Sequence, residues 1–119
     1  MAYNIWVAWE IELTEQVERW LLNELDVTGR RQIVPAIDEL EEVGPTLGRP
    51  LVDRIKASRH HNMKELRSTG GSVRILFAFD PERKAILLIG GDKTGRWNDW
   101  YSKNIPIADD LYDEHLEDL

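Results

Sequence analysis

The sequence predicts one α+β domain, in which an N-terminal strand and two helices precede a three-stranded antiparallel meander and a C-terminal helix. Apolar residues alternate near the N-terminus and again in the middle of the chain, and they follow helical spacing in between and at the end. The 119 residues are enough for one hydrophobic core and few for two. We therefore expect residues 1–119 to form a single domain whose helices cover one face of a mostly antiparallel sheet.

The N-terminal half changes from a strand signal to two helix signals. Residues 3–9 (YNIWVAW) alternate and are rich in aromatic and β-branched side chains, which predicts a first strand. Residues 13–25 place apolar side chains at helical spacing, and Thr14 is suited to cap the start of that helix. A second helix should follow from about Thr28, with Pro35 kinking it or delaying its start, and a Gly-Pro dipeptide should end it.

The C-terminal half contains three strand signals and a final helix. Residues 51–62 carry no clear pattern, so we expect an irregular segment there. The three strands are expected at MKELR, SVRILFAF and KAILLIG, joined by the turn sequences STGG and DPER. Residues 92–104 predict a loop with at most one helical turn, and Pro106 is suited to the first position of the last helix.

Charge is distributed unevenly along the chain, whose net charge is −7. Residues 1–47 hold ten acidic and three basic residues, residues 48–104 hold six acidic and twelve basic ones, and residues 105–119 hold six acidic residues and no Lys or Arg. A basic middle between acidic ends is typical of a local anion site on an otherwise acidic protein. Ordinary solvated faces are the alternative, which the charge counts alone favour.

Cysteine is absent from the sequence, which excludes disulfides, thiolate metal sites and a cysteine nucleophile. The first residues lack the basic flank and apolar run of a signal peptide, and no apolar run is long enough to cross a bilayer. We expect a soluble, cytoplasmic protein that does not contact membranes. The acidic residues early in the last helix complement its dipole, so we expect neither a metal nor another cofactor.

The hairpin around STGG concentrates charge on one face. If Arg67 pairs with Ser72, then Glu65 lies opposite Arg74, and the side chains of Glu65, Arg67 and Arg74 all project from the same side of the sheet. Leu66 and Val73 point the other way. Arg74 can form a cross-strand ion pair with Glu65, whereas Arg67 has no partner in the hairpin, so we expect its charge to be available.

Further cations flank this hairpin. Antiparallel pairing would bring Lys93 and Arg96 out of the sheet close to Arg67. Gly90 and Gly91 fit either a plain strand end or the close approach of a backbone. Three more residues lie toward the opposite end of the first meander strand: His60, His61 and Lys64. They would reach Arg67 only if the preceding loop folds over the sheet.

Residues from about 45 to 117 resemble a known family. The features that carry the resemblance are ELR on a strand, a glycine turn, VRILFAFD, the strand AILLI, GGDKTG, then WY and IPIAD. Together they resemble the RelE/HigB-type toxins of bacterial toxin–antitoxin modules, in particular the actinobacterial HigB-like subgroup. The order of the expected elements matches a RelE-like fold over the whole chain.

This resemblance implies a toxin that enters the ribosomal A site and cuts mRNA there without a metal. A helix-turn-helix antitoxin would sequester it, and operator DNA would be contacted only through that antitoxin. The family's basic sheet-face residues would correspond to Arg67 and Arg74, and its cation after the last strand to Lys93. Its downstream aromatic residue would correspond to Tyr101, with Trp100 as the other candidate. HigB relatives often carry a histidine and a lysine pair where this chain has GGDK, so one cation is missing.

Metal-free RNA cleavage uses the neighbouring 2′-hydroxyl as nucleophile and needs proton transfer and positive charge at the phosphate. Arg67 and Arg74 suit the charge role, and Lys93 and Arg96 would hold the flanking backbone. Tyr101 would orient a phosphate or stack on a base. The possible proton carriers and further RNA contacts are His60, His61, Lys64 and Trp100. The histidines have the better acidity for a general base and the poorer expected position.

Two rival functions remain open from the sequence. A ParE-like protein would inhibit gyrase by binding it and would catalyse nothing. A catalytically weak relative would only bind its antitoxin, which the acidic balance and the missing cation favour. The endonuclease hypothesis requires three cations from separate strands, Arg67, Arg74 and Lys93, to meet on one patch that is open to solvent.

Overall fold

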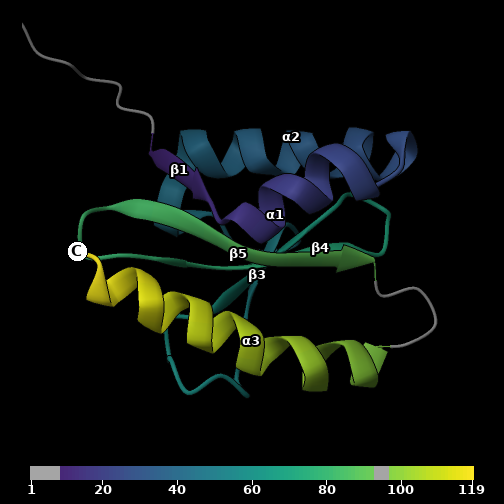
Figure 1. Cartoon of the computed structure of the whole chain (residues 1–119). Coiled ribbons are helices and arrows are strands. Elements are labelled where there is room, and N and C mark those ends of the chain that lie inside the picture. The colour runs from purple at the N-terminus through teal and green to yellow at the C-terminus, as the bar shows by residue number, and fades with distance from the viewer. Residues whose placement is uncertain (1–8, 93–96) are drawn as a thin grey trace, which may run out of the picture.

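The structure, a computed structural model, describes residues 9–92 and 97–119 (Figure 1). Its elements, in chain order, are β1 (Glu10–Leu13), α1 (Glu15–Arg19), a π-helical segment (Trp20–Glu24), α2 (Val27–Val43), a 3-10 turn (Gly44–Thr46), β2 (Val52–Arg54), β3 (Lys64–Arg67), β4 (Val73–Phe79), β5 (Lys84–Asp92) and α3 (Trp97–Glu117). The predicted α+β class is confirmed, with a strand and two helices before the antiparallel meander and a helix after it.

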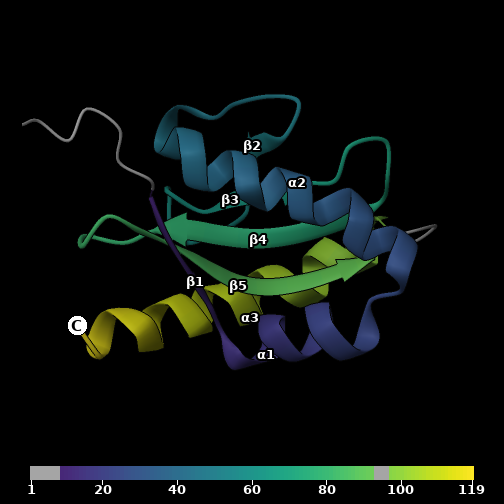
Figure 2. The same cartoon turned by 90° about the horizontal axis from the view of Figure 1, so that it is seen from above.

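The strands form one five-stranded sheet in the order β1-β5-β4-β3-β2. Strand β1 is parallel to β5, and the other neighbours are antiparallel. Helices α1 and α2 lie on one face and α3 lies on the other, as Figures 1 and 2 show. The expectation of helices on one face only is therefore wrong.

Strand β4 explains why both faces need a cover. Ile75 and Phe77 pack in the core beneath α1 and α2, whereas Leu76 and Ala78 pack in a second core beneath α3. All four side chains are fully buried. Because both faces of the central strand are apolar, the sheet is stable only with a helical layer on each side.

The starts and ends of the N-terminal helices follow the local sequence. The Thr14 side chain accepts a hydrogen bond from the backbone N–H of Val17 at 3.2 Å, so the predicted N-cap is confirmed. Helix α2 starts at Val27 and continues through Pro35. One side of α2 is buried in the core on both sides of this proline, which offsets the backbone hydrogen bond that the proline removes. The helix ends at Gly44, whose φ of 73° favours glycine.

Two strands differ from the expectation. Strand β1 begins at Glu10, and the expected strand at residues 3–9 lies, except for Trp9, outside the described residues. Strand β2 forms inside the segment that was expected to be irregular, where it pairs antiparallel with β3 and makes one edge of the sheet. A strand of three residues leaves no readable alternation in the sequence, so only the pairing reveals it.

Helix α3 is longer than predicted. It begins at Trp97, and Pro106 lies inside it. Residues Tyr101, Ile105 and Tyr112 face the sheet at helical spacing on both sides of the proline. Burial of this continuous stripe outweighs the loss of one backbone hydrogen bond at Pro106. The helix therefore continues through the proline that was expected at its first position. Within residues 9–92 and 97–119, no helix has the length and apolar character that spanning a membrane requires.

Candidate functional site

The hairpin of β3 and β4 brings the two predicted arginines together. Arg67 pairs directly with Arg74, whereas we expected Arg67 to pair with Ser72. The hairpin closes with the Ser68 N–H donating to the Val73 carbonyl, so the loop starts one residue later than predicted. The register therefore changes by two residues, which leaves every side chain on its predicted face. Glu65, Arg67 and Arg74 share the face that α3 covers.

A buried carboxylate lies between the two arginines. Arg74 Nε is 3.1 Å from Glu65 Oε1, and Arg67 Nη2 is 3.5 Å from Glu65 Oε2. Arg67 Nη2 also donates to Asp53 Oδ2 of β2 at 2.9 Å. Glu65 is 3% exposed and Arg74 7% exposed, whereas the Arg67 side chain keeps 31% of its surface. The expectation that the charge of Arg67 is unpaired is wrong, because β2 supplies a carboxylate that the sequence did not reveal.

Tyr101 brings helix α3 to the same carboxylate. Its hydroxyl donates a hydrogen bond to Glu65 Oε1, the oxygen that also contacts Arg74. Burial, followed by this hydrogen bond, raises the pKa of Tyr101 far above its ordinary value. The phenol therefore stays protonated near neutral pH and can donate a proton or a hydrogen bond, but it cannot act as a general base.

Two adjacent glycines of β5 make room for indole rings on opposite faces of the sheet. A Cβ on Gly91 would lie 2.2 Å from Nε1 of Trp100, and a Cβ on Gly90 would lie 2.3 Å from the ring of Trp20. Trp100 packs edge-to-face on Tyr101 with a centroid distance of 5.2 Å. Gly91 thus lets α3 approach β5 closely, which positions Tyr101 over Glu65.

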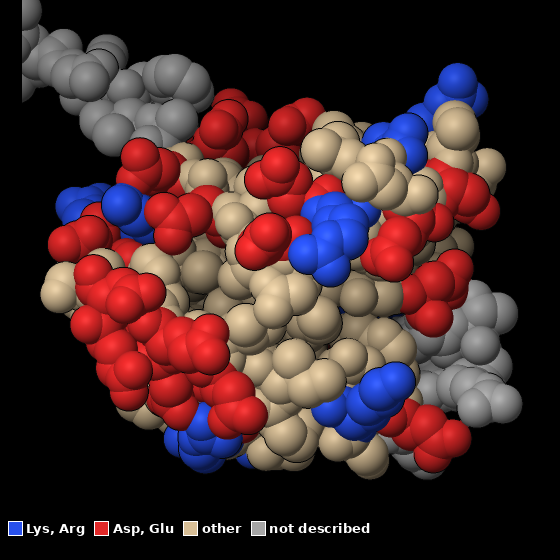
Figure 3. Space-filling view, viewed as in Figure 1, with Lys and Arg blue, Asp and Glu red and all other residues tan. Residues whose placement is uncertain are grey.

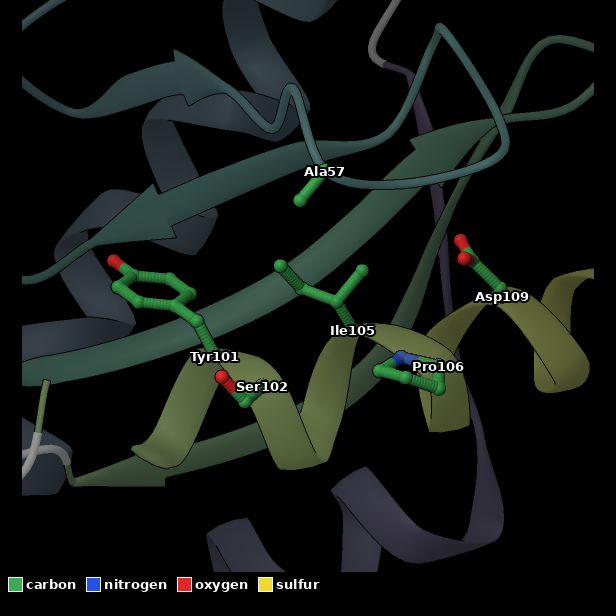
Figure 4. A pocket seen from close by; sticks show the side chains of 6 residues that line it. All are labelled: Ala57, Tyr101, Ser102, Ile105, Pro106 and Asp109. Atoms are coloured by element: carbon green, nitrogen blue, oxygen red, sulfur yellow. The ribbon is translucent and has the colours of Figure 1, made fainter. Parts of the chain in front are cut away.

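A cavity of about 210 Å³ lies beside Tyr101, between α3 and the loop that contains Ala57. Figure 4 shows the side chains of Tyr101 and Ile105 projecting from α3 toward this loop. Its other lining residues are Ser102, Pro106 and Asp109. The cavity is close to the carboxylate-bridged arginines and has one aromatic wall.

His60 does not reach this cluster. Its Nε2 lies 2.8 Å from Asp113 Oδ1, and its ring packs edge-to-face on Tyr112. Asp113 is twelve residues after Tyr101 on α3, which corresponds to about 18 Å along the helix axis. The condition that the loop before β3 brings His60 to Arg67 is therefore not met, because the acidic half of α3 holds this loop.

Lys64 lies on the opposite face of the sheet from the arginine pair, because it pairs with Phe77 of the other core, and His61 lies beside Lys64 in the same groove. They line a groove of about 530 Å³ at the β2 edge, together with Arg49, Arg54 and Asp53. The pKa of Asp53 is lowered, first by the hydrogen bond from the Arg54 backbone N–H and then by the hydrogen bond from Arg49, so it is ionised. Arg49 and Arg54 were not among the predicted site residues, although both belong to the basic middle of the sequence.

Lys93 and Arg96, the cations expected after the last strand, lie outside the described residues. Of the three cations required on one patch, the structure thus brings together Arg67 and Arg74, and Tyr101 contacts the carboxylate between them. The patch is not open, because α3 covers Arg74 and carboxylates contact both arginines, so the required open patch of three cations is not met in this conformation. In the described part of the chain, no group of three or more His, Asp and Glu side chains could hold a metal ion.

Comparison with known proteins agrees with this architecture. The family described as "Phage derived protein Gp49-like (DUF891)" matches residues 20–113. The chain is 60% identical over 97 residues to "Putative toxin HigB3" of Mycobacterium tuberculosis, a match that covers 82% of this chain and 84% of that protein. The chain belongs to the Gp49-like family of RelE/HigB toxins. A second relative, "Putative toxin HigB2" of the same organism, is 52% identical over 113 residues, and this match covers 92% of the chain but 55% of that protein.

Solved RelE structures share the fold of this Gp49-like chain. The isolated Escherichia coli RelE toxin has a TM-score of 0.57 at 15% identity, covering 82% of this chain and 99% of that chain. The archaeal RelE–RelB complex of Pyrococcus horikoshii has a TM-score of 0.55 at 18% identity, covering 76% of this chain and 99% of that chain. The predicted RelE-like fold is confirmed. Residue roles do not follow from identities this low.

Proposed function

We propose that this Gp49-like protein is the toxin of a toxin–antitoxin module and acts as a ribosome-dependent, metal-independent mRNA endonuclease in the cytoplasm. A helix-turn-helix antitoxin would bind and inactivate it, and any contact with operator DNA would pass through that antitoxin. Family membership supports the toxin class. Arg67, Arg74 and Tyr101 converge on Glu65, and this cluster supports the chemistry only if α3 moves away from it, because the patch is covered in the present conformation.

That convergence is the observation that carries the proposal. Two arginines directly opposite each other in a sheet repel, and a buried ion pair seldom stabilises a fold more than apolar residues would. A cluster of this kind is instead suited to function, because fixed guanidinium groups stabilise the charge that develops on a cleaved phosphate. Glu65 holds both forks in place before any substrate arrives.

Each side chain then has a distinct role. Arg67 is the more exposed arginine and would contact the scissile phosphate first. Arg74 would complete the charge once the Tyr101 hydroxyl leaves Glu65, since α3 covers it in the present conformation. Tyr101, protonated because of its raised pKa, would donate a hydrogen bond to a phosphate oxygen or a proton to the leaving oxygen. The cavity beside its ring suits a stacked base.

A second candidate function is favoured by the same contacts. Because carboxylates pair with both arginines and Arg74 is buried, the protein could bind its antitoxin without cleaving RNA. Such a relative would cause neither growth arrest nor cleavage. A ParE-like gyrase inhibitor would cause growth arrest without mRNA cleavage.

Toeprinting of mRNA on purified ribosomes separates these functions. Wild-type protein should cut mRNA in the A site, and Arg67→Ala should cut at least about tenfold more slowly, because the variant has one charged group fewer to stabilise the transition state. Arg19→Ala, an exposed arginine of α1 far from the cluster, is the matched control and should cut as wild type does. Equal rates for Arg67→Ala and Arg19→Ala would refute the proposed role of Arg67.

The two alternatives give their own signatures. Wild-type protein that arrests growth and inhibits gyrase supercoiling, but leaves mRNA intact, would identify the gyrase inhibitor. Protein that does neither, and still binds a co-expressed helix-turn-helix partner, would identify the non-catalytic relative.

A further inference from the structure

We infer that the groove at the β2 edge, whose Arg54 and Lys64 project from the sheet face opposite the Arg67–Arg74 cluster, is a second anion site that holds the phosphate backbone of structured RNA. The groove is lined by three cations and one histidine, Arg49, Arg54, Lys64 and His61. That the bound RNA is ribosomal RNA depends on the proposed function. That the groove binds RNA backbone at all depends only on the geometry of the groove.

Arg54 and Lys64 are direct partners across β2 and β3, so their side chains emerge side by side on one face. Like charges in this position destabilise a sheet. In the described part of the chain, neither side chain makes an ion pair with a carboxylate; Lys64 lies 5.6 Å from the centre of the Phe79 ring. An anion from outside would remove the repulsion that the protein itself leaves uncompensated.

The remaining walls of the groove extend this charge. The Arg49 side chain is 77% exposed and lies on the loop before β2. His61 is exposed and, within residues 9–92 and 97–119, makes no hydrogen bond or ion pair. Asp53 is the acidic residue of the lining, and its carboxylate already binds Arg49 and Arg67. Gly48 has open space beside it, so a backbone can approach this wall.

The β2 edge is closed to the addition of another strand. In the observed register, the N–H groups of Val52 and Arg54 point away from β3. The first donates to the Gly48 carbonyl at 3.1 Å, and the second donates to Asp53 Oδ1 at 2.8 Å. A partner must therefore be recognised by the side chains. Arginine forks and a lysine along a groove that Phe, Tyr and Trp do not line match successive phosphates rather than unstacked bases.

Part of the acidic surface behind the net charge of −7 lies away from the groove. Figure 3 shows acidic side chains gathered over the C-terminal half of α3, on the side of the molecule where β1 and α1 lie. Strand β2 is at the other edge of the sheet (Figure 2). The Debye length is about 8 Å at physiological salt, so charges across the domain are screened from the groove.

Fluorescence anisotropy with a labelled RNA duplex of arbitrary sequence tests the site on the full chain. Arg54→Gln with Lys64→Gln should weaken binding at least about tenfold and lower the slope of log Kd against log salt by about two, one for each phosphate that is no longer neutralised. Arg19→Gln, which removes an exposed charge at the other side of the domain, should change neither quantity beyond a small uniform shift. Arg54→Gln alone should lower the slope by about one, and it keeps the test valid if the double variant does not fold.

Three results would overturn the inference: no duplex binding by wild type, equal binding by the groove variant and Arg19→Gln, or displacement of the duplex by polyglutamate at equal charge. The last result would identify an acidic protein partner. Endonuclease activity is measured separately on ribosomes, where the groove variant should cleave normally at saturation and need more ribosomes for half-maximal rate. Absence of cleavage by wild type, with specific duplex binding retained, would refute the proposed function and leave the groove assignment intact.

Discussion

Two pairs of cations face each other across neighbouring strands, and the protein treats them differently. Arg67 and Arg74 meet across β3 and β4, where buried Glu65 contacts both and α3 covers them. Arg54 and Lys64 meet across β2 and β3 on the other face, where a groove lies open to solvent. The first pair is compensated by the fold itself, whereas the second pairs with no carboxylate in residues 9–92 and 97–119 and is proposed to bind an external anion. The comparison separates cations that carboxylates neutralise within the fold from cations that are exposed to a ligand.

The largest effect should come from removing the carboxylate of the covered pair. Glu65→Ala removes the buried carboxylate that contacts both arginines, which should lower the free energy of unfolding by about 3–5 kcal/mol. Glu10→Ala, which removes a 66% exposed partner of Lys84, should cost less than about 1 kcal/mol. Urea unfolding of both variants measures the difference. Similar decreases for the two variants would mean that the arginine pair is not effectively buried.

The next effect concerns the cover over that pair. Gly91→Ala places a Cβ 2.2 Å from Trp100, so the indole must move and Tyr101 should shift away from Glu65. We expect the free energy of unfolding to fall by about 1–3 kcal/mol and the tryptophan fluorescence to change. Gly48→Ala, where a Cβ meets nothing within 4 Å, is the control and should leave both quantities unchanged. An unaltered spectrum for Gly91→Ala would show that α3 does not depend on this close approach.

A smaller effect should follow from Tyr101→Phe, which deletes the hydroxyl that binds Glu65. The decrease in stability at neutral pH should be about 1–2 kcal/mol, because the acceptor Glu65 is charged and buried. The folded state raises the pKa of this phenol, so its protonated form stabilises the fold fully below the ordinary value of 10.0, and this contribution fades at higher pH. Urea unfolding from about pH 7 to 11 should show the wild type losing its advantage over the variant above about pH 10. An advantage that grows in that range would contradict the assignment.

The smallest effect on stability is expected in the open groove. Arg49→Ala removes a 77% exposed side chain whose ion pair with Asp53 contributes less than about 0.5 kcal/mol. Its RNA affinity should nonetheless fall several-fold at low salt, because one cation fewer faces the phosphates. Thermal melting and anisotropy on the same sample check both outcomes. A decrease in stability comparable to that of Glu65→Ala would show that the two cation groups are not different in kind.

Local sequence predicted much of the fold for identifiable reasons. Helix caps, helix stops and turns depend only on a few neighbouring residues. The sequence therefore predicted the cap at Thr14, the Gly-Pro end of α2 and the turns of the meander. The extent of α3 was not, because Pro106 signals a boundary locally while Tyr101 and Ile105 obtain their stabilisation from a sheet that is distant in sequence. Strand β2 was not predicted for a similar reason, since it forms only through its pairing with β3.

The predicted face of the charged side chains is confirmed, whereas their partners were not predicted and their roles remain a proposal. The alternation of side chains along a strand puts Glu65, Arg67 and Arg74 on one face in both the expected and the observed register, because the two differ by two residues. It could not supply Asp53, which reaches Arg67 from β2, or the Tyr101 hydroxyl that covers Glu65. His60 was a candidate by residue type alone, but Asp113 holds it at the other end of α3.

The sequence by itself determined the order of the elements, the sidedness of the charges and the resemblance to RelE/HigB toxins, because period, caps and motifs are properties of neighbouring residues. Only the tertiary structure decided which of those charges are neutralised. Ion pairs depend on which strands become neighbours and on what the C-terminal helix covers, and both are set by contacts between residues that are far apart in the chain. The covered arginines and the open groove are therefore outcomes of packing.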